Sequence, residues 1–299
     1  MDFSRVGKKI QELRQYNQLT QAELADGICT QAQISKIENG SIIPYSNTLF
    51  QIAEKLGADM YYFFEEAVSE RPDYVQDVFD QLEECRFTQD YKQMEALISY
   101  EKDNPLFTPP LYKQYIAWHK GIFLYHLYRK TEEAFEQLLF SISIDPNPSF
   151  TERKAEISNS LAVLYNLEER YEDAEVLCKE ALNKWKQMRK RKDPSIEMKL
   201  TYTLAISLTK QHRYKESAQW CEKGIKRCLE TRTMYVFGEL LYQKGRNLLL
   251  MGKTEKGLEH WSEALGMFKS TRQHHLVDLM DKEMNQFIKD GVLKEINYE

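Results

Sequence analysis

The stretch that decides the fold is residues 19–57, which read LTQAELADGICTQAQISKIENGSIIPYSNTLFQIAEKLG. Thr20 and Glu23 have the spacing of a capping box, so a helix is predicted to begin at Thr20. Thr30 begins a second short helix, which Gly40 ends. Two helices separated by so few residues are typical of a helix-turn-helix, whose second helix lies in the major groove of DNA.

Amphipathic segments flank this pair on both sides. Residues 4–16 place apolar side chains at spacings of four and three, on one face of a helix. Residues 45–56 form a fourth helix, and a fifth begins at Asp59. Together these segments predict a small helical head, which is either a DNA-binding domain or a bundle without a ligand.

Three sequence motifs of the head closely resemble those of the lambda-repressor/Cro-like family. The matching positions are Leu19, Thr20, Gln21, Leu24 and Ala25; Ile34, Ser35, Ile37, Glu38 and Gly40; and Pro44, Leu49, Ile52, Ala53 and Leu56. The resemblance covers the head and implies sequence-specific DNA binding.

The contacts with DNA are expected from the second of the two central helices and its flanks. Gln31 is long enough to pair bidentately with adenine, and Ala32 suits a thymine methyl group. Gln21 begins the preceding helix, and its side chain can hydrogen-bond to a DNA phosphate. From the resemblance and this side-chain chemistry, the expected DNA-binding residues are Gln21, Thr30, Gln31, Ala32, Gln33, Lys36, Asn39 and Ser41.

The charges of the head are balanced. Residues 1–57 contain six basic and six acidic side chains. A neutral head gains little non-specific affinity from phosphates. A monomer is therefore expected to bind weakly, and a homodimer on a two-part operator in double-stranded DNA is predicted.

The composition excludes several classes of protein. The formal net charge is −5, and no stretch approaches the ~18 apolar residues of a membrane span. The first twenty residues are charged throughout and have no apolar core of a secretory signal. The five cysteines include no CxxC pair and fit reduced thiols. We expect a cytoplasmic protein without membrane contact.

After residue 72 the chain is repetitive. A small or compact residue of the second helix in each unit recurs at steps of 40, 40, 43 and 40, at Met94, Ala134, Ala174, Ser217 and Gly257. Around Ala174 the small and aromatic residues fall at the offsets of a tetratricopeptide repeat. A last helix from His275 to Lys289 is expected to cap the array.

The predicted fold is therefore all-α. It is a lambda-repressor/Cro-like helical DNA-binding domain followed by a tetratricopeptide-repeat right-handed solenoid. The expected segments are the DNA-binding domain at 1–66, a linker helix at 67–90, five repeats at 73–272, and a capping helix and tail at 273–299. A plain helical bundle is the alternative, but the nearly constant steps favour the solenoid.

The first helices of such repeats line the inner wall of the array. The predicted inner positions mix aromatics, amides and isolated charges, which suits an extended peptide; an ordinary solvated surface is the alternative. Arg86, Lys199 and Arg246 are the cations available for a terminal carboxylate. The residues expected to bind the peptide are Arg86, His119, Phe123, His126, Asn159, Val163, Asn166, Lys199, Tyr202, Ile206, Tyr242 and Arg246.

A Cro-like head on a five-repeat array resembles the peptide-sensing transcription regulators of Gram-positive bacteria. This is the Rgg/PlcR/NprR/PrgX class, and the chain is most similar to its PlcR type. The resemblance implies a quorum-sensing regulator whose DNA binding is controlled by a short signalling peptide on the concave wall. It implies that Asn159 clamps the peptide backbone. Thr203 stands where the fourth repeat often carries a second asparagine, a departure from the pattern of the class.

Other functions have weaker support. His119 and His126 share a helix face, but a metal site needs three or four donors, so no metal is expected. No catalytic motif is found, so no cofactor and no enzymatic activity are expected. The basic run Arg189 to Lys192 is expected to end a helix, where cations complement the dipole, and a nucleic-acid patch is the less favoured alternative. The alternatives are an interaction scaffold or a phosphatase-like regulator, either with a head that binds no DNA.

Overall fold

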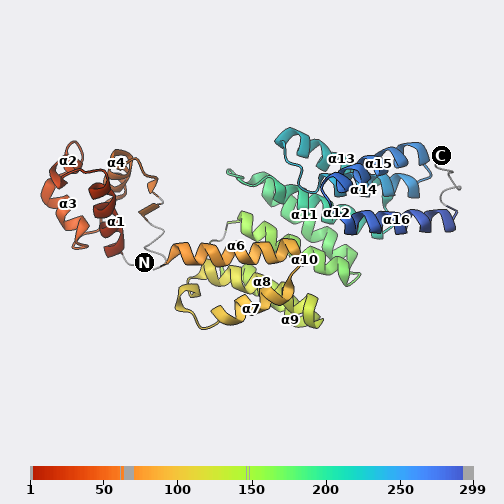
Figure 1. The fold of residues 1–299 in the computed structure, drawn as a ribbon, viewed down its shortest axis with the longest axis horizontal. Helices are drawn as coiled ribbons and strands as arrows, with labels where there is room; N and C mark the ends of the chain where they lie inside the picture. The colour runs from red at the N-terminus through yellow and green to blue at the C-terminus, as the bar shows by residue number, and fades with distance from the viewer. Residues whose placement is uncertain (1–2, 61, 64–70, 146, 148, 292–299) are drawn as a thin grey trace. The chain divides into compact units, whose positions relative to one another are not determined.

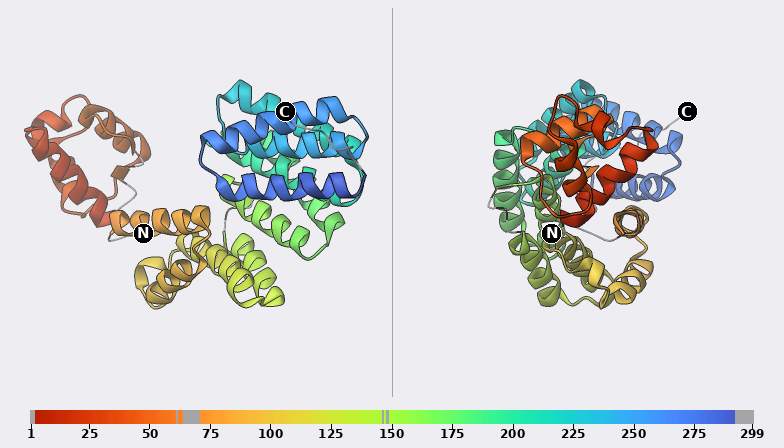
Figure 2. Two further views of the ribbon diagram at one scale, coloured as in Figure 1. Left: turned by 45° about the vertical axis from the view of Figure 1, so that its right-hand side comes forward. Right: turned by 90° about the vertical axis from the view of Figure 1, so that its left-hand side faces the viewer.

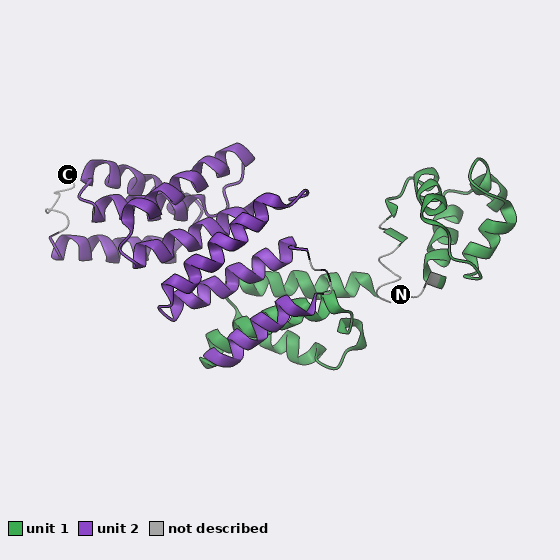
Figure 3. Cartoon of the chain, turned by 180° about the vertical axis from the view of Figure 1, so that it is seen from behind, with its two compact units in different colours: residues 1–130 green, residues 131–299 purple. Residues whose placement is uncertain are grey.

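A computed structural model describes residues 3–60, 62–63, 71–145, 147 and 149–291. Every regular element in these residues is a helix (Figure 1). By contact the chain divides into two compact units, residues 1–130 and 131–299 (Figure 3). Within the described ranges, no helix is both long and apolar enough to cross a membrane.

The head in unit 1 contains four well-defined helices, α1 (Phe3–Tyr16), α2 (Gln21–Ala25), α3 (Gln31–Glu38) and α4 (Ser46–Leu56). Thr20 and Glu23 form the predicted capping box of α2, and Thr30 and Gln33 form another at α3. The predicted fifth helix falls partly on residues 61 and 64–70, outside the described residues. The head core is apolar and includes Val6, Ile10, Leu24, Ile34, Ile37, Leu49, Ile52 and Phe63.

Two glycines allow α1 to lie close to α3. A Cβ atom on Gly7 would fall 1.9 Å from the carbonyl oxygen of Ile37. Gly40 has φ +74°, and a Cβ there would fall 2.9 Å from Ser4 Cβ. Because a side chain at either position would separate the helices, these glycines fix how α3 is presented.

The rest of unit 1 consists of α6 (Pro72–Thr88), α7 (Tyr91–Glu101), the 3-10 helix η1 (Pro105–Phe107) and α8 (Pro110–Tyr128). Helix α7 packs against both α6 and α8. Trp118 on α8 is fully buried, and the Arg86 guanidinium of α6 lies 4.6 Å from its ring centroid. The contact between Arg86 and Trp118 joins the first predicted repeat to the first helix of the second.

Unit 2 is a succession of antiparallel helices (Figure 2). They are α9 (Thr131–Ile144), α10 (Glu152–Leu167), α11 (Tyr171–Gln187), α12 (Ser195–Lys210), α13 (Tyr214–Thr231), α14 (Phe237–Leu250), α15 (Thr254–Ser270) and α16 (His274–Lys289). Each packs mainly on its neighbours in sequence, and α10, α12 and α14 also contact one another in that order. Helix α16 begins one residue before the predicted capping helix and ends where predicted.

The residues that mark the repeats in the sequence are packing positions. Four of the five have no exposed surface and the fifth is buried: Met94, Ala134, Ala174, Ser217 and Gly257. Small size matters most in the last pair, where a Cβ on Gly245 would lie 2.9 Å from the carbonyl oxygen of Gly257. Small residues therefore set the close approach of α14 and α15.

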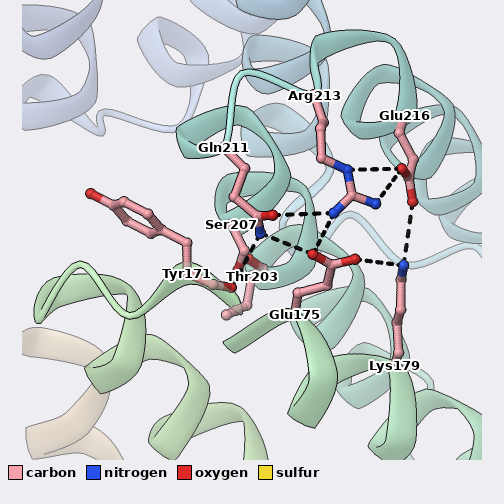
Figure 4. A network of polar contacts seen from close by, with 8 residues as sticks. All are labelled: Tyr171, Glu175, Lys179, Thr203, Ser207, Gln211, Arg213 and Glu216. Atoms are coloured by element: carbon pink, nitrogen blue, oxygen red, sulfur yellow. Dashed lines mark hydrogen bonds and ion pairs between the residues drawn. The ribbon is translucent and has the colours of Figure 1, made fainter. Parts of the chain in front are cut away.

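A polar network joins α11 to the α12–α13 connection (Figure 4). The carboxylate of Glu175 accepts hydrogen bonds from Lys179 at 2.7 Å, Gln211 at 2.9 Å and Arg213 at 2.5 Å. Glu216 on α13 also pairs with Arg213. Because one carboxylate links two repeats, the network fixes their register more firmly than isolated surface pairs do.

A second polar cluster is buried between α12, α13 and α14. Thr209 Oγ1 donates to Asn247 Oδ1 at 2.8 Å, and Asn247 Nδ2 donates to Ser217 Oγ at 2.8 Å. Gln243 Nε2 donates to Thr209 Oγ1 at 2.6 Å. Buried groups that satisfy one another in this way specify one arrangement of the three helices.

One predicted helix end is wrong. Helix α11 ends at Gln187, and Met188 is extended, so the run Arg189 to Lys192 lies in the following loop. On a helix Arg189 and Lys192 would stand three residues apart on one face, where like charges repel each other. The backbone N–H groups of Lys192 and Asp193 bond instead to the Glu152 carboxylate, the latter at 3.2 Å.

Candidate DNA-binding and peptide-binding sites

Helix α3 presents one polar face and buries the other. Ile34 and Ile37 are buried in the head core. The expected base-contacting side chains are exposed, at Gln31, Ala32, Gln33 and Lys36. The helix therefore has one buried apolar face and one exposed polar face, as a recognition helix requires.

A chain of hydrogen bonds leads from the head core to this exposed face. Arg14 and Glu38 form a two-point ion pair, with Nε–Oε1 at 2.6 Å and Nη2–Oε2 at 3.0 Å. Gln21 Nε2 donates to Glu38 Oε2 at 2.8 Å. Gln31 Nε2 in turn donates to Gln21 Oε1 at 2.7 Å. The buried ion pair thereby orients the side chain at the start of α3.

This geometry leaves Gln31 able to read a base. An amide nitrogen carries two hydrogens, and only one is used in the bond to Gln21. The second hydrogen and Oε1 form the donor and acceptor that match adenine N7 and N6. Because Gln21 and Glu38 fix the amide, little side-chain entropy remains to be lost on binding.

The other four expected DNA contacts lie at the two ends of α3 and have local roles. Gln33 Oε1 accepts from Thr30 N at 3.0 Å, and Thr30 Oγ1 accepts from Gln33 N at 3.2 Å. Asn39 Oδ1 accepts from Ser41 N at 3.0 Å. These bonds cap α3 and shape the turn after it, and DNA contacts by Thr30, Gln33, Asn39 and Ser41 stay predictions.

In unit 2, Asn159 lies beside the residue that departs from the pattern of the class. Thr203 Oγ1 on α12 donates to Asn159 Oδ1 on α10 at 2.9 Å. Asn166, two turns along α10, donates from Nδ2 to the Thr203 carbonyl at 3.2 Å. Thr203 therefore holds the acceptor of Asn159, and no group of the described residues hydrogen-bonds to Asn159 Nδ2. That leaves an oriented donor on a half-buried side chain.

The predicted cations of unit 2 are already paired with carboxylates. Lys199 lies 3.4 Å from Glu156 of α10. Arg246 pairs with Glu283 of α16, which also accepts a hydrogen bond from Tyr242. Burial, together with this carboxylate, raises the pKa of the Tyr242 hydroxyl far above its usual range. A peptide carboxylate would therefore have to displace Glu156 or Glu283 to reach a cation.

The remaining predicted positions in unit 2 are apolar or aromatic. Val163, Tyr202 and Ile206 are each half-buried on α10 and α12. Burial raises the pKa of Tyr202 far above its usual range, so its hydroxyl stays protonated at neutral pH. This part of the wall is suited to apolar side chains of a ligand.

In unit 1 the predicted positions differ in exposure. His119 has no exposed surface, its Nδ1 lies 2.9 Å from the Tyr115 carbonyl, and Phe123 is also buried. His126 is half-buried and stacks on Tyr91 with ring centroids 4.2 Å apart. The expectation that His119 and Phe123 face a peptide is therefore not met in this conformation, because helix packing covers them.

The sequence did not indicate the roles of two carboxylates, Glu38 in the head and Glu283 on α16. Glu38 was read only as part of a family motif, although Arg14 falls on the inner face of α1, four residues after Ile10. That spacing was the available signal for a buried ion pair. Glu283 had no local signal, because it meets Arg246 only through the packing of α16.

Comparison with known proteins is consistent with this geometry. A model of the RNPP family C-terminal domain matches residues 79–289, and a helix-turn-helix domain model matches residues 7–67. A comparison with curated protein sequences gave no match.

Three solved structures are similar to the chain over nearly its whole length. PlcR of Bacillus thuringiensis, in complex with the peptide PapR7 and DNA, has 22% identity, a TM-score of 0.84 and coverage of 93% of this chain and 99% of that chain. ComR of S. thermophilus with DNA and its signalling peptide ComS has 14% identity, a TM-score of 0.65 and coverage of 93% and 98%. The Streptococcus dysgalactiae SHP pheromone receptor Rgg2 has 16% identity, a TM-score of 0.61 and coverage of 94% and 99%.

The two family models together define a protein with a helix-turn-helix head and a helical C-terminal domain. Since the C-terminal domain model covers more than half of its length, the chain belongs to the RNPP family. The predicted all-helical fold, with a helix-turn-helix head and a repeat domain, is thereby confirmed.

Proposed function

We propose that the chain is a quorum-sensing transcription regulator. In this proposal α3 binds an operator in double-stranded DNA, and a short linear peptide on the repeat domain controls that binding. The proteins it resembles were solved with DNA and with signalling peptides, which supports both halves. We further propose a cytoplasmic homodimer, because a head with balanced charge needs two half-sites to bind tightly.

The observation that carries the peptide proposal is the oriented amide of Asn159. Its acceptor is held by Thr203, and its donor has no partner among the described residues. A donor fixed in this way recognises a peptide carbonyl whatever side chains the peptide carries. Side chains of the ligand then contact the half-buried Val163, Tyr202 and Ile206.

The charges of this wall indicate which interactions contribute most to peptide affinity. Lys199 and Arg246 are neutralised within the chain, so backbone hydrogen bonds and apolar burial dominate affinity over charge. A carboxylate of the peptide can pair with Lys199 or Arg246 only by displacing Glu156 or Glu283. It therefore adds to the binding free energy only the difference between the new ion pair and the one it replaces. Peptides with an amidated C-terminus are therefore expected to retain most of their affinity.

Calorimetry with the peptide encoded beside the gene tests the ligand site. Asn159→Ala is expected to weaken binding about tenfold to a hundredfold, the effect of leaving a buried peptide group unpaired at about 1–3 kcal/mol. Asn183→Ala on α11 is the matched control, since Asn183 is exposed and distant in sequence. Equal affinities for wild type and Asn159→Ala would remove Asn159 from the site.

Selection of DNA from a random pool tests the head. Wild type is expected to enrich a pseudo-palindrome with half-sites a whole number of turns apart, about 34 Å per turn. Gln31→Ala should relax preference at one base pair per half-site, at about 1–3 kcal/mol. Gln15→Ala, an exposed glutamine of α1, is the control. A pool without any enriched sequence would favour the scaffold alternative, which the neutral head also fits.

A further inference from the structure

Unit 2 carries a dense basic segment that the proposed function does not use. Residues 184–192 contain six basic side chains and no acidic one, in a chain whose net charge is −5. All six are exposed: Lys184, Lys186, Arg189, Lys190, Arg191 and Lys192. Such a concentration opposes folding by self-repulsion unless a partner or solvent screens it.

The helix dipole does not account for these charges. Only Lys184 and Lys186 lie in the last turn of α11, which ends at Gln187. The favourable effect of a helix C-terminus on a cation fades within that turn. The four cations of the loop therefore gain little from it.

The nearest carboxylates are engaged elsewhere. Glu152 accepts from the backbone N–H groups of Lys192 and Asp193. Asp193 accepts from Ser195 N and Ser195 Oγ, both at 2.8 Å. These bonds hold the loop backbone while its basic side chains face solvent. Within the described ranges, one ion pair involves the six cations, between Lys184 and Glu180 at 3.9 Å.

The basic surface continues onto α13. A depression of about 230 Å³ between α11 and α13 is lined by Lys186, Lys223 and Lys226, among others. Its wall also contains two carboxylates: Glu197 pairs with Arg227 at 3.2 Å, and Glu230 pairs with Arg227 at 3.3 Å and with Lys226 at 4.0 Å. The basic surface therefore extends from the loop to α13 and includes residues of two helices as well as the loop.

We propose that this basic surface, the loop at residues 184–192 with Lys223, binds the phosphate backbone of duplex DNA. The proposal rests on the proposed function, which brings DNA into the complex. The six basic side chains of residues 1–57 are offset by six acidic ones, so phosphate contacts from cations outside the head add to the counterion release on binding. Flexible lysines and arginines contact phosphates without reading bases, so the surface adds affinity that is independent of sequence.

Salt dependence measures these contacts directly. Full-length wild type is compared with the quadruple variant R189Q/K190Q/R191Q/K192Q, by fluorescence anisotropy on a random-sequence duplex between about 50 and 200 mM salt. The slope of log Kobs against log salt is expected to fall by about 0.9 per lost phosphate contact, and by up to about 3.6 for four. The Glu152 bonds go to backbone groups, so the loop is expected to keep its conformation.

A matched variant controls for net charge. K210Q/K253Q/K256Q/K269Q removes four exposed lysines from other parts of unit 2 and should leave the slope unchanged. Circular dichroism checks that both variants are folded. An unchanged slope in R189Q/K190Q/R191Q/K192Q, or an equal fall in the control, overturns the proposal.

Two further measurements identify which partner the basic surface binds and distinguish failure of this proposal from failure of the proposed function. If the loop variant loses affinity for single-stranded RNA or for phosphatidylserine vesicles but not for duplex DNA, the assignment to DNA is wrong. If wild type selects an operator but the loop variant keeps the wild-type slope, this proposal fails and the proposed function stands. If wild type binds no duplex at any salt concentration, both fail.

Discussion

Replacing Glu38 by leucine should unfold the head while leaving the repeats intact. The Arg14–Glu38 pair is buried, with side chains 10% and 2% exposed, and it is bonded at two points. Removing one partner of a buried pair costs about 3–5 kcal/mol, because the other charge stays buried without compensation. Arg14 keeps its bond to the Leu19 carbonyl, so we expect the lower end, about 3 kcal/mol.

The double variant Arg14→Met/Glu38→Leu separates charge burial from loss of packing. Without either charge no unpaired ion remains, and only the hydrogen bonds to the Leu19 carbonyl and to Gln21 are lost. We expect a cost of about 1–2 kcal/mol, which is about 1–2 kcal/mol less than the cost of Glu38→Leu alone.

Hydrogen exchange followed by mass spectrometry reports this stability. The four tryptophans, at 118, 185, 220 and 261, all lie outside the head, so fluorescence follows the repeats alone. Exchange of the amides of α1 to α4 should accelerate in Glu38→Leu and largely recover in the double variant. The reasoning is refuted if the single variant matches wild type or if the double variant is no more stable than the single.

Two further outcomes follow from the repeat units. Thr203→Val keeps the shape of the side chain but releases Asn159, so peptide affinity should fall about twofold to tenfold in calorimetry while DNA binding without peptide is unchanged; full affinity would show that Thr203 does not orient Asn159. Burial, assisted by Arg129, lowers the pKa of His126 below 6.5, so its contribution to stability is complete above that pH and is lost as pH falls through 6.5 toward the folded-state value. The thermal midpoint of His126→Phe should therefore decrease less than that of wild type between about pH 7.5 and 5.5, and identical pH profiles would contradict this.

Local chemistry made much of the fold predictable from the sequence. The capping boxes at Thr20 and Thr30 depend on residues three positions apart, and both are present. The exposed face of α3 follows from its buried Ile34 and Ile37. The repeat markers were found because close helix packing requires a small or compact side chain at each one.

Ion pairs between residues far apart in the chain could not be predicted from the sequence. Glu156 and Glu283 neutralise Lys199 and Arg246 from 43 and 37 residues away, and nothing near either cation indicates its partner. The helix expected to contain Arg189 ends early because a carboxylate from α10 binds the backbone of the loop. Exposure of the inner wall also depends on packing, which covers His119 completely.

Genome-wide DNA binding in cells, with and without the peptide gene, tests the central claim most directly. The account predicts enrichment of one pseudo-palindromic site whose occupancy changes when the peptide gene is deleted. It predicts that the same change is absent in Asn159→Ala and that enrichment is lost or redistributed in Gln31→Ala. Occupancy that ignores the peptide would contradict peptide control, and the absence of any enriched site in both states would contradict the regulator assignment itself.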